Sequence, residues 1–382
     1  LMNILQLGKF HPYSSGGIER LVKIYSKTLS YANNRCDVIC FCNNGKTKVE
    51  TSQKFKIFSC RLLFSLVNAP ISLSYIYTLD KIISSYNLIH IHLPNPGALI
   101  ALLIVSRFKK CKFTIHYHAE TRGKKFYKFY KLLETFALKN ALGIITTSEN
   151  LANSPTLKSY IKKITVIPST IGKKDFSLSK DKINNYFFDF EKQKYLIFVG
   201  RFTKYKNLNM LIYSFCKVRE QFEDLKLLIC GNGSEYFAIK KQIKDLGLSK
   251  EVKIILDPNE DEKKFLLKNA LFSIFPATTI AEAFGLSQLE SMAFGTPVIS
   301  FDILYSGVSF VNQHKKTGYV IKNLSLTSNK INQEKLTKAI FFMLNNFDSL
   351  KKMHNDCICW AKMFVLEEHK KSIKDFFLDK SN

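Results

Sequence analysis

The feature that most restricts the fold of this chain is a regular alternation of short apolar runs with amphipathic helical patterns. The apolar runs of the first half are NILQL, DVICFC, LIHIHL and KFTIHYH. Helical patterns such as those of residues 18–31 and 96–108 separate them. Strands that alternate with helices are typical of βαβ units around a parallel sheet. The sequence therefore predicts an α/β protein with parallel sheets.

The same alternation occurs twice, which indicates two domains. A Lys-rich stretch without a clear pattern follows the first set of units, and the second set begins at YLIFVG. We therefore expect an N-terminal domain over residues 1–170, an interdomain connection over 171–194 and a C-terminal domain over 195–350. The helices predicted in residues 351–382 are expected to cross back to the N-terminal domain.

Composition excludes several classes of protein. Hydrophobic residues make up 46% of the chain and the mean hydropathy is −0.05, which is typical of a folded globular protein. The nine cysteines are scattered and none forms a C-x-x-C pair, so a zinc ribbon or a thioredoxin-like site is not expected. No apolar stretch reaches the about 20 residues of a bilayer span, and the N-terminus lacks a signal-peptide pattern, so we expect a cytoplasmic protein.

Charge is unevenly distributed along the chain. The formal net charge is +26, and residues 1–170 contain 24 basic and 7 acidic residues. An excess of this size favours an anionic partner for the N-terminal domain.

Ligands of open parallel sheets bind outside the carboxyl ends of the strands, and four loops at such positions stand out. In the first loop, Gly16 and Gly17 open a helix, so backbone N–H groups could approach an anion there. An ordinary tight turn gives the same pattern, since G-x-G-x-x-G is absent. In another loop, Gly231 and Gly233 follow a strand and could admit a ligand closely, although G-x-G alone is a weak signal.

A basic loop, GRFTKYKN, directly follows the strand YLIFV. Its Arg201 and Lys206 are expected at the carboxyl edge of the sheet, where two cations can neutralise a diphosphate. A loop whose charges are simply solvated is the alternative interpretation.

The most informative loop lies in FPATTIAEAFGLSQLESMAFGTPVIS, which predicts a strand, a loop, a helix and another strand. Glu282 lies in the loop, and Glu290 lies two turns inside the helix. The first-turn amides are those of Phe284, Gly285 and Leu286. A helix N-terminus flanked by two carboxylates can hold a phosphate on its amides and sugar or ribose hydroxyls on its carboxylates. A helix with two solvated glutamates fits the spacing as well.

The segment EAFGLSQLESMAFGTPVIS resembles the E-x7-E signature of the retaining group-1 glycosyltransferases, known as family 4, which have the GT-B fold. GRFTKYKN resembles their G-R-(x)4-K-G phosphate loop, and GGIERL resembles their N-terminal Gly-Gly loop. HLPNPGAL, HYHAE and SGVSFVNQHKKTGYVI look closest to bacterial members that build surface polysaccharides, including rhamnosyl- and mannosyltransferases. The resemblance runs in order over nearly the whole chain, and it implies two Rossmann-like domains whose parallel sheets face each other across a cleft.

The resemblance also implies roles for individual residues. It implies that Arg201 and Lys206 hold the donor diphosphate and that Glu290 holds the ribose. Glu282 would bind hydroxyls of the transferred sugar, and His118 matches the family's active-site histidine near that sugar.

Gly16 and Gly17 would line the cleft from the acceptor side. Three features depart from the family pattern. Ala283 and Asn207 stand where Gly is usual, and the chain after Pro168 lacks the common G-x-D ending.

Two histidine pairs, His90/His92 and His116/His118, lie on predicted strands. Residues two apart on a strand share a face, so four imidazoles on neighbouring strands could surround a metal. In the interpretation that we favour, three are structural and only His118 faces the cleft. Asp-x-Asp is absent, which fits an enzyme without a metal or other cofactor, because the cationic loop and the helix N-terminus can stabilise a leaving diphosphate.

The expected reaction moves a hexose, with mannose from GDP-mannose as the first choice, to a glycan or lipid-diphosphate-linked acceptor of bacterial surface polysaccharide synthesis. We expect same-face attack, with the leaving phosphate accepting the acceptor's proton; Glu282 as a covalent nucleophile is the alternative. A sugar-nucleotide epimerase can share the GT-B architecture. A NAD-dependent dehydrogenase would need G-x-G-x-x-G, and a nucleic-acid-binding protein would need a reader motif or a basic face with stacking aromatics, so no nucleic acid is expected.

An anionic membrane surface is a further expected partner, because the segment GKKFYKFYKLLETFALKN mixes aromatic and basic residues as interfacial helices do. One helix face would hold Phe126, Phe129, Tyr130, Leu133, Phe136 and Ala137. Four lysines flank its first half: Lys124, Lys125, Lys128 and Lys131. One interpretation is peripheral binding to the inner face of the cytoplasmic membrane, and the other is packing of this stripe on the protein's own sheet.

Overall fold

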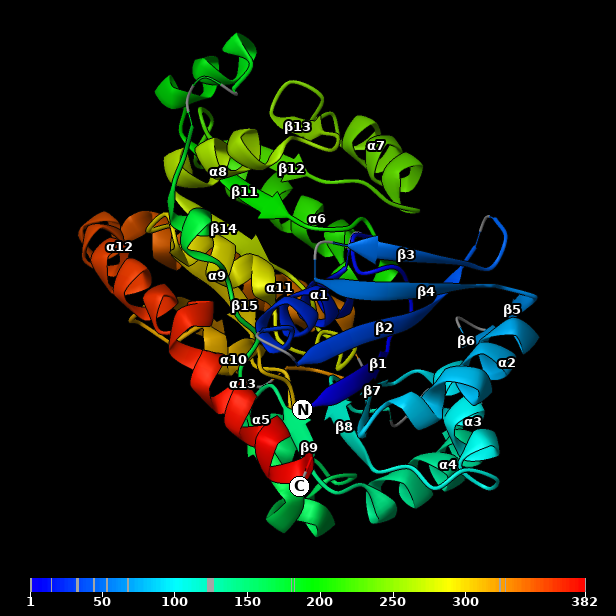
Figure 1. Ribbon diagram of the computed structural model, residues 1–382. Coiled ribbons are helices and arrows are strands. Elements are labelled where there is room, and N and C mark those ends of the chain that lie inside the picture. The colour runs from blue at the N-terminus through cyan, green and yellow to red at the C-terminus, as the bar shows by residue number, and fades with distance from the viewer. Residues whose placement is uncertain are drawn as a thin grey trace. The chain divides into compact units, whose positions relative to one another are not determined.

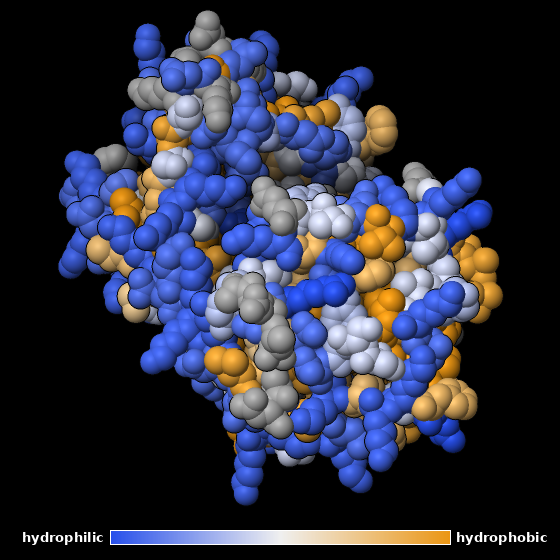
Figure 2. All heavy atoms as spheres, in the orientation of Figure 1, coloured by the Kyte–Doolittle hydropathy of each residue, from blue (hydrophilic) through white to orange (hydrophobic). Residues whose placement is uncertain are grey.

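The computed structural model describes residues 2–381 apart from 15, 32–33, 44, 53, 67–68, 122–126, 180, 182, 323 and 327. The chain forms two compact units, one of Leu1–Ser169 with His369–Asn382 and one of Thr170–Glu368. None of the helices in the described ranges is both long enough and apolar enough to cross a membrane. On the face shown in Figure 2, hydrophilic residues predominate and hydrophobic residues form scattered patches.

The first unit is built on an eight-stranded sheet in the order β10-β9-β8-β7-β1-β2-β4-β3 (Figure 1). Its neighbours are parallel except for β3 and β4, which pair antiparallel at one edge. The chain order reverses between β1 and β7, and ligands of open sheets bind at such a switch point. The strands are β1 (Asn3–Leu7), β2 (Arg35–Cys42), β3 (Lys48–Ser52), β4 (Phe55–Arg61), β7 (Leu88–Leu93), β8 (Phe113–Tyr117), β9 (Ile144–Thr146) and β10 (Ile164–Val166), beside a small hairpin of β5 (Phe64–Leu66) and β6 (Ala69–Ile71).

Helices cover both faces of this sheet. They are α1 (Gly17–Leu29), α2 (Leu73–Ile82), α3 (Pro96–Val105), α4 (Tyr127–Asn140), α5 (Glu149–Ala152) and α13 (Leu366–Ser381), with 3-10 turns η1 (Ile83–Ser85) and η2 (Lys158–Lys163). Side chains alternate along β7, so Ile89 joins the apolar core that includes residues of α2 and α3, while His90 points to the opposite face. On that face, Tyr25 of α1 and Phe377 of α13 pack against the His90 ring.

The second unit has a six-stranded sheet in the order β13-β12-β11-β14-β15-β16, in which all neighbours are parallel. Its strands are β11 (Tyr195–Val199), β12 (Lys226–Cys230), β13 (Val252–Ile255), β14 (Phe272–Phe275), β15 (Val298–Phe301) and β16 (Gly318–Ile321). Here the chain order reverses between β11 and β14. The loops after these two strands are therefore the expected place for a ligand, and they are the loops that contain Arg201 and Glu282.

The helices of the second unit are α6 (Leu208–Arg219), α7 (Tyr236–Asp245), α8 (Glu260–Asn269), α9 (Leu286–Met292), α10 (Val308–Val311), α11 (Asn329–Asn345) and α12 (Phe347–Lys362), with 3-10 turns η3 (Lys173–Phe176), η5 (Asn185–Lys192) and η6 (Lys204–Lys206). Helix α6 packs with α7 and α11, whereas α9 packs with α8 and α12. The start of α8 is fixed by a capping box, in which the Asn259 side chain accepts from the Glu262 amide and the Glu262 carboxylate accepts from the Asn259 amide.

The predicted class, α/β with two Rossmann-like domains and parallel sheets, is confirmed. The division of the chain differs from the predicted one at two places. Residues 171–194, predicted as a connection, belong to the second unit, because Ile183 and Phe190 are buried in its core. The predicted boundary at residue 350 lies inside α12, whose Met353 and Cys357 are buried in the same core.

Candidate active site

The basic loop after β11 is held in place by the glycine loop after β12. The Gly200 amide donates to the Cys230 carbonyl at 3.0 Å, and the Phe202 amide donates to the Asn232 carbonyl at 2.7 Å. A Cβ atom on Gly231 would lie 2.0 Å from the Gly200 oxygen, and one on Gly233 would lie 2.4 Å from the Phe202 oxygen. Gly231 and Gly233 therefore allow the backbone of the basic loop to approach closely. The sequence suggested that a ligand could approach at this position, but the basic loop lies there instead.

Lys206 and Glu282, predicted at different loops, meet in an ion pair. The Lys206 Nζ atom lies 2.5 Å from Glu282 Oε2, and their side chains are only 9% and 12% exposed. The ammonium group also lies 4.5 Å from the centre of the Phe275 ring. Arg201 is different, because it is exposed and forms no ion pair with any residue that the structure describes. The structure thus brings a shielded cation and carboxylate together and leaves a second cation open to solvent.

Asn207 explains one departure from the family pattern. Its φ of 59° and ψ of 38° are left-handed, a conformation that Gly and Asn adopt most readily. The Asn207 side chain donates to Thr278 Oγ1 at 3.0 Å and so ties the basic loop to the loop that follows β14. An asparagine can therefore replace the usual glycine without changing the backbone.

The backbone around Glu282 is fixed by a serine that the sequence did not single out. Ser306 is fully buried, and its Oγ donates to the carbonyls of Glu282 at 2.5 Å and Ala283 at 3.3 Å. The Gly307 amide also donates to the Ala283 carbonyl, at 2.7 Å. Since these donors follow β15 and are far from Glu282 in sequence, spacing alone gave no signal for them.

The N-cap of helix α9 is Gly285, whose φ of 85° lies in the left-handed region that favours glycine. In the part of the chain that the structure describes, the amides of Phe284, Gly285 and Leu286 have no hydrogen-bond acceptor. Open amides at a helix start are suited to an anion. The three predicted amides are thus available together.

Glu290, in the second turn of α9, is 18% exposed and lies 3.3 Å from Lys263 Nζ of helix α8. Lys263 also contacts Glu260, at 3.1 Å. Burial favours a lower pKa for Lys263, but the Glu290 and Glu260 carboxylates outweigh it and hold the pKa above its ordinary value. Lys263 orients the Glu290 carboxylate, and its contact with Glu290 joins two helices in a way that sequence spacing could not reveal.

In the first unit, His118 follows β8 and is 4% exposed. Its amide donates to the Leu93 carbonyl at 2.9 Å, its ring stacks on His116 with centroids 4.1 Å apart, and its Nε2 lies 2.9 Å from His92 Nδ1. Burial lowers the pKa of His118 to about 3, so the ring is neutral near pH 7. His118 can therefore exchange hydrogen bonds with a ligand but does not bring a positive charge.

The four histidines form one buried cluster. His90, His92 and His116 each offer a ring nitrogen within 4.8 Å of the others, and burial lowers the pKa of all three, which keeps them in the neutral form that ligates metals. Both nitrogens of His92 already have partners, in His118 and Gln6. A metal would have to displace one of these contacts, so the absence of a metal requirement remains our prediction.

Gly16 and Gly17 lie at the start of α1, as expected for the first loop. A Cβ atom on Gly16 would lie 2.0 Å from Glu19 Oε2, because the Glu19 side chain folds back over the helix start. The N-terminus of α1 therefore already faces a carboxylate of its own chain. A sugar hydroxyl suits this loop better than the anion considered from the sequence.

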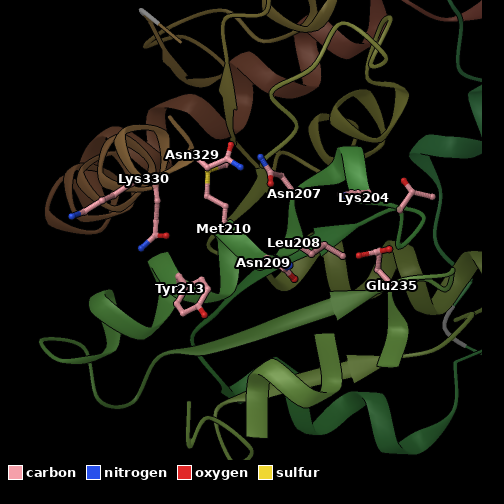
Figure 3. A pocket seen from close by; sticks show the side chains of 11 residues that line it. Lys204, Asn207, Leu208, Asn209, Met210, Tyr213, Glu235, Asn329 and Lys330 are labelled. Atoms are coloured by element: carbon pink, nitrogen blue, oxygen red, sulfur yellow. The ribbon is translucent and has the colours of Figure 1, made fainter. Parts of the chain in front are cut away.

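A pocket of about 350 Å³ lies beside the basic loop, at the beginning of α6 (Figure 3). Its wall includes Lys204 and Asn207 from the loop, Tyr213 from α6 and Lys330 from α11. Lys206 and Glu282 are not part of this wall. The pocket is thus separate from the residues predicted to hold the donor.

Comparison with known proteins identifies both halves of the chain. The family model "Glycosyltransferase Family 4" matches residues 15–171, and "Glycosyl transferases group 1" matches residues 179–358. O-antigen chain mannosyltransferase C of Escherichia coli is 28% identical over 84% of each chain. D-rhamnosyltransferase WbpZ of Pseudomonas aeruginosa is 26% identical over 69% of this chain and 68% of its own.

Solved structures agree on the fold. Sucrose-phosphate synthase from Thermosynechococcus elongatus superposes with a TM-score of 0.78 at 17% identity, covering 99% of each chain. Anabaena HepE in complex with UDP-glucose gives a TM-score of 0.76 at 16% identity, covering 99% of this chain and all of its own. The chain belongs to the GT-B glycosyltransferases, with a family 4 domain in its first half and a group 1 domain in its second.

Proposed function

We propose that this glycosyltransferase is a retaining enzyme that moves a hexose from a nucleotide sugar to a glycan or lipid-linked glycan of a bacterial surface polysaccharide. The observation that carries the proposal is the Lys206–Glu282 pair in the same unit as the open amides that begin α9. Three relatives are named for such reactions: two O-antigen chain mannosyltransferases and a D-rhamnosyltransferase.

The donor diphosphate would bind to Arg201, Lys206 and the amides of Phe284, Gly285 and Leu286. Before the donor arrives, the Lys206 ammonium is neutralised by Glu282. A diphosphate that takes hydrogen bonds from Lys206 would free an oxygen of the Glu282 carboxylate, which can then accept a hydroxyl of the sugar. Donor binding and sugar recognition are coupled through this one contact.

The ribose would bind to Glu290, whose carboxylate is oriented by Lys263. Carboxylates are suitable for this role because they can accept hydrogen bonds from two adjacent hydroxyls. Gly16, Gly17 and His118 would contact sugar groups, since they offer small backbone or neutral polar surfaces rather than charge.

For the chemical step we propose same-face attack. The bond from the anomeric carbon to the phosphate oxygen breaks, the bond to the acceptor oxygen forms, and the acceptor's proton moves to the departing phosphate. Cations and amides at the leaving group stabilise its growing charge, by a few kcal/mol for each donor. Glu282 as a covalent nucleophile is the alternative. A glycosyl adduct on Glu282, trapped with a slow donor analogue and detected by mass spectrometry, would contradict this mechanism.

GDP-mannose is the proposed donor, on the names of the relatives. The test is a thermal-shift titration of the purified protein with GDP-mannose, GDP-rhamnose, UDP-glucose and UDP-galactose. A donor at 100 times its Kd stabilises the folded protein by about 2.7 kcal/mol, whereas a nucleotide sugar that does not bind leaves Tm unchanged. Stabilisation by a UDP-sugar but not by GDP-mannose would reject the donor, and stabilisation by none of the four would count against the proposed donor site.

We also propose a cytoplasmic enzyme whose first unit docks on anionic lipid. The predicted apolar stripe of α4 is divided in the structure: Ala137 is buried, Tyr130 and Leu133 pack on the core, and Phe136 is 55% exposed. Leu132, one turn before Phe136, is 72% exposed. Phe126, Lys124 and Lys125 lie outside the described residues, as do the side chains of Lys128 and Phe129.

Leu132 and Phe136, which are both exposed on α4, suggest a docking surface that differs from the predicted stripe. Lys131 and Lys139 are exposed on the same helix, and near an anionic surface each basic residue contributes about 1 kcal/mol. Co-sedimentation should show more protein bound to vesicles of phosphatidylglycerol than of phosphatidylcholine, with release by salt. The Leu132→Ser/Phe136→Ser variant should lose binding, whereas equal, weak binding of both proteins to both vesicles would contradict the docking proposal.

A further inference from the structure

A glutamine in the middle of β1 has an orientation that its neighbours fully determine. Gln6 is completely buried, and its Nε2 group donates to the Val22 carbonyl at 3.0 Å and lies 2.6 Å from Ser26 Oγ. A backbone carbonyl can only accept, so the amide NH₂ must face α1. The Gln6 Oε1 atom therefore faces the other way, where it lies 2.9 Å from His92 Nε2.

This orientation determines the proton of His92. Since Gln6 Oε1 can only accept, His92 Nε2 must carry a hydrogen. Burial, reinforced by the neighbouring histidines, holds the pKa of His92 well below its ordinary value, so the ring is neutral. A neutral imidazole carries one proton, and His92 Nδ1 is therefore an acceptor.

The same reasoning extends one residue further. His118 Nε2 lies 2.9 Å from His92 Nδ1, and this contact is a hydrogen bond only if His118 Nε2 donates. His118 is also neutral, because burial lowers its pKa to about 3. Its Nδ1 atom consequently carries a lone pair, and within the described residues the hydrogen bond of the His118 ring is the one at Nε2.

We infer that Gln6 and His92 are positioning residues that fix the proton of His118 on Nε2, so that His118 presents Nδ1 as a hydrogen-bond acceptor. The stacking of His118 on His116, with ring planes 16° apart, fixes the direction of this lone pair. An acceptor of fixed direction suits a hydroxyl of the transferred sugar. The link to turnover rests on the proposed function of His118, whereas the position of the proton does not.

These hydrogen bonds also explain how the buried polar side chain of Gln6 is tolerated in a central strand. A buried amide without partners would destabilise the fold by about 1–3 kcal/mol, so a glutamine in a central strand needs a full set of hydrogen bonds. Gln6 obtains that set from α1 on one side and from His92 on the other. Sequence reasoning missed Gln6, since a single polar residue in NILQL gives no sign of what it faces.

The test uses the full chain with ¹⁵N-labelled histidine, in which NMR reports which ring nitrogen of each histidine carries a proton. The spectrum of His118→Asn assigns the His118 signals. In the wild type we expect His118 protonated on Nε2 only, with a ¹⁵N–¹⁵N coupling across the hydrogen bond to His92 Nδ1. A His118 proton on Nδ1 would overturn the inference.

Gln6→Met then removes the acceptor for His92 and keeps the side-chain volume. We expect loss of the coupling and a kcat lower by ~10-fold, the lower limit seen for partners that orient metal-ligating histidines, with an unchanged KM for the donor. Ser26→Ala is the matched control, because the Val22 carbonyl still fixes the Gln6 amide, and it should keep the coupling and kcat. A Gln6→Met protein that is folded by thermal unfolding and retains both the coupling and kcat would overturn the positioning role.

The proposed function of His118 and the proposed position of its proton can be refuted independently. If His118→Ala keeps wild-type transfer, the proposed function of His118 is wrong, and the link to turnover falls with it. In that case the NMR result alone decides whether Gln6 and His92 fix the proton.

Discussion

Replacing Lys206 by methionine tests the donor site most sharply, because it removes the charge and leaves an apolar side chain of similar length. The Lys206 Nζ and Glu282 Oε2 atoms are 2.5 Å apart, which corresponds to an attraction of about 7 kcal/mol at an effective dielectric constant of 20. Desolvation of both groups offsets much of this attraction, and truncating one partner of a buried pair typically costs 3–5 kcal/mol. Since the side chains keep 9% and 12% exposure, we expect a loss near the lower limit, about 3 kcal/mol.

The assay measures stability and transfer in the same set of variants. A loss of about 3 kcal/mol corresponds to a fall of ~6–12 °C in Tm for a unit of this size. If Lys206 meets a charge that grows in the transition state, kcat/KM should also fall by ~10²-fold, which is about 2.7 kcal/mol. Arg201→Met should lower kcat/KM to a similar extent with little change in Tm, because Arg201 is exposed.

A double variant separates the two effects. Lys206→Met with Glu282→Gln leaves no unpaired buried charge, so it should recover most of the lost stability and still transfer sugar poorly. Recovery of kcat/KM together with Tm would show that the pair is only structural. Near-normal kcat/KM in both Lys206→Met and Arg201→Met would remove the diphosphate from this loop.

The remaining predictions concern the other parts of the site and the histidine cluster. Glu290→Gln should raise the donor Kd by ~10-fold or more with a small change in kcat, whereas Glu282→Gln should chiefly lower kcat; isothermal titration and initial rates separate them, and equal loss of folding in both would contradict the assignments. Dialysis against EDTA should leave turnover unchanged, and a loss restored by Zn²⁺ would instead implicate the histidines. Burial lowers the pKa of His90 and His118 to about 3 and holds the pKa values of His92 and His116 well below their ordinary value, so these groups gain protons near pH ~6.5 only on unfolding. Stability should therefore be full above pH ~6.5 and fall by up to ~5 kcal/mol per pH unit below it, and urea midpoints that stay constant from pH 7.5 to 5.5 would refute this reasoning.

Much of the fold follows from local signals. The alternation of apolar runs with helical patterns predicted both parallel sheets, and the GRFTKYKN loop does follow a strand of the second sheet. Residues 171–194 were predicted as a connection because they have a weak pattern and many lysines, and the structure groups them with the second unit, where Ile183 and Phe190 are buried. A periodic pattern indicates helices and strands, and it does not reveal single apolar residues that are buried from segments of irregular backbone.

The site was predictable as a set of loops but not as a set of contacts. Lys206 and Glu282 are 76 residues apart, and only the sheet topology brings their loops together. Lys263 had no motif, and Ser306 begins the segment SGVSFVNQHKKTGYVI without a predicted role, since each acts through a neighbour rather than through a spacing. The pattern of Gly231 and Gly233 fits a ligand-binding loop, yet the backbone of the adjacent basic loop lies against both glycines, where a ligand could have approached.

Helix α13 has a consequence for how the chain is made. Its residues from His369 onward belong to the first unit, although all of the second unit precedes them in sequence. Phe377 packs against Tyr25 and His90, so part of one face of the first sheet is covered when α13 leaves the ribosome. The second unit is complete in sequence before that moment. Synthesis from the N-terminus therefore completes the second unit before the first, and His90 lacks its contact with Phe377 until α13 has emerged.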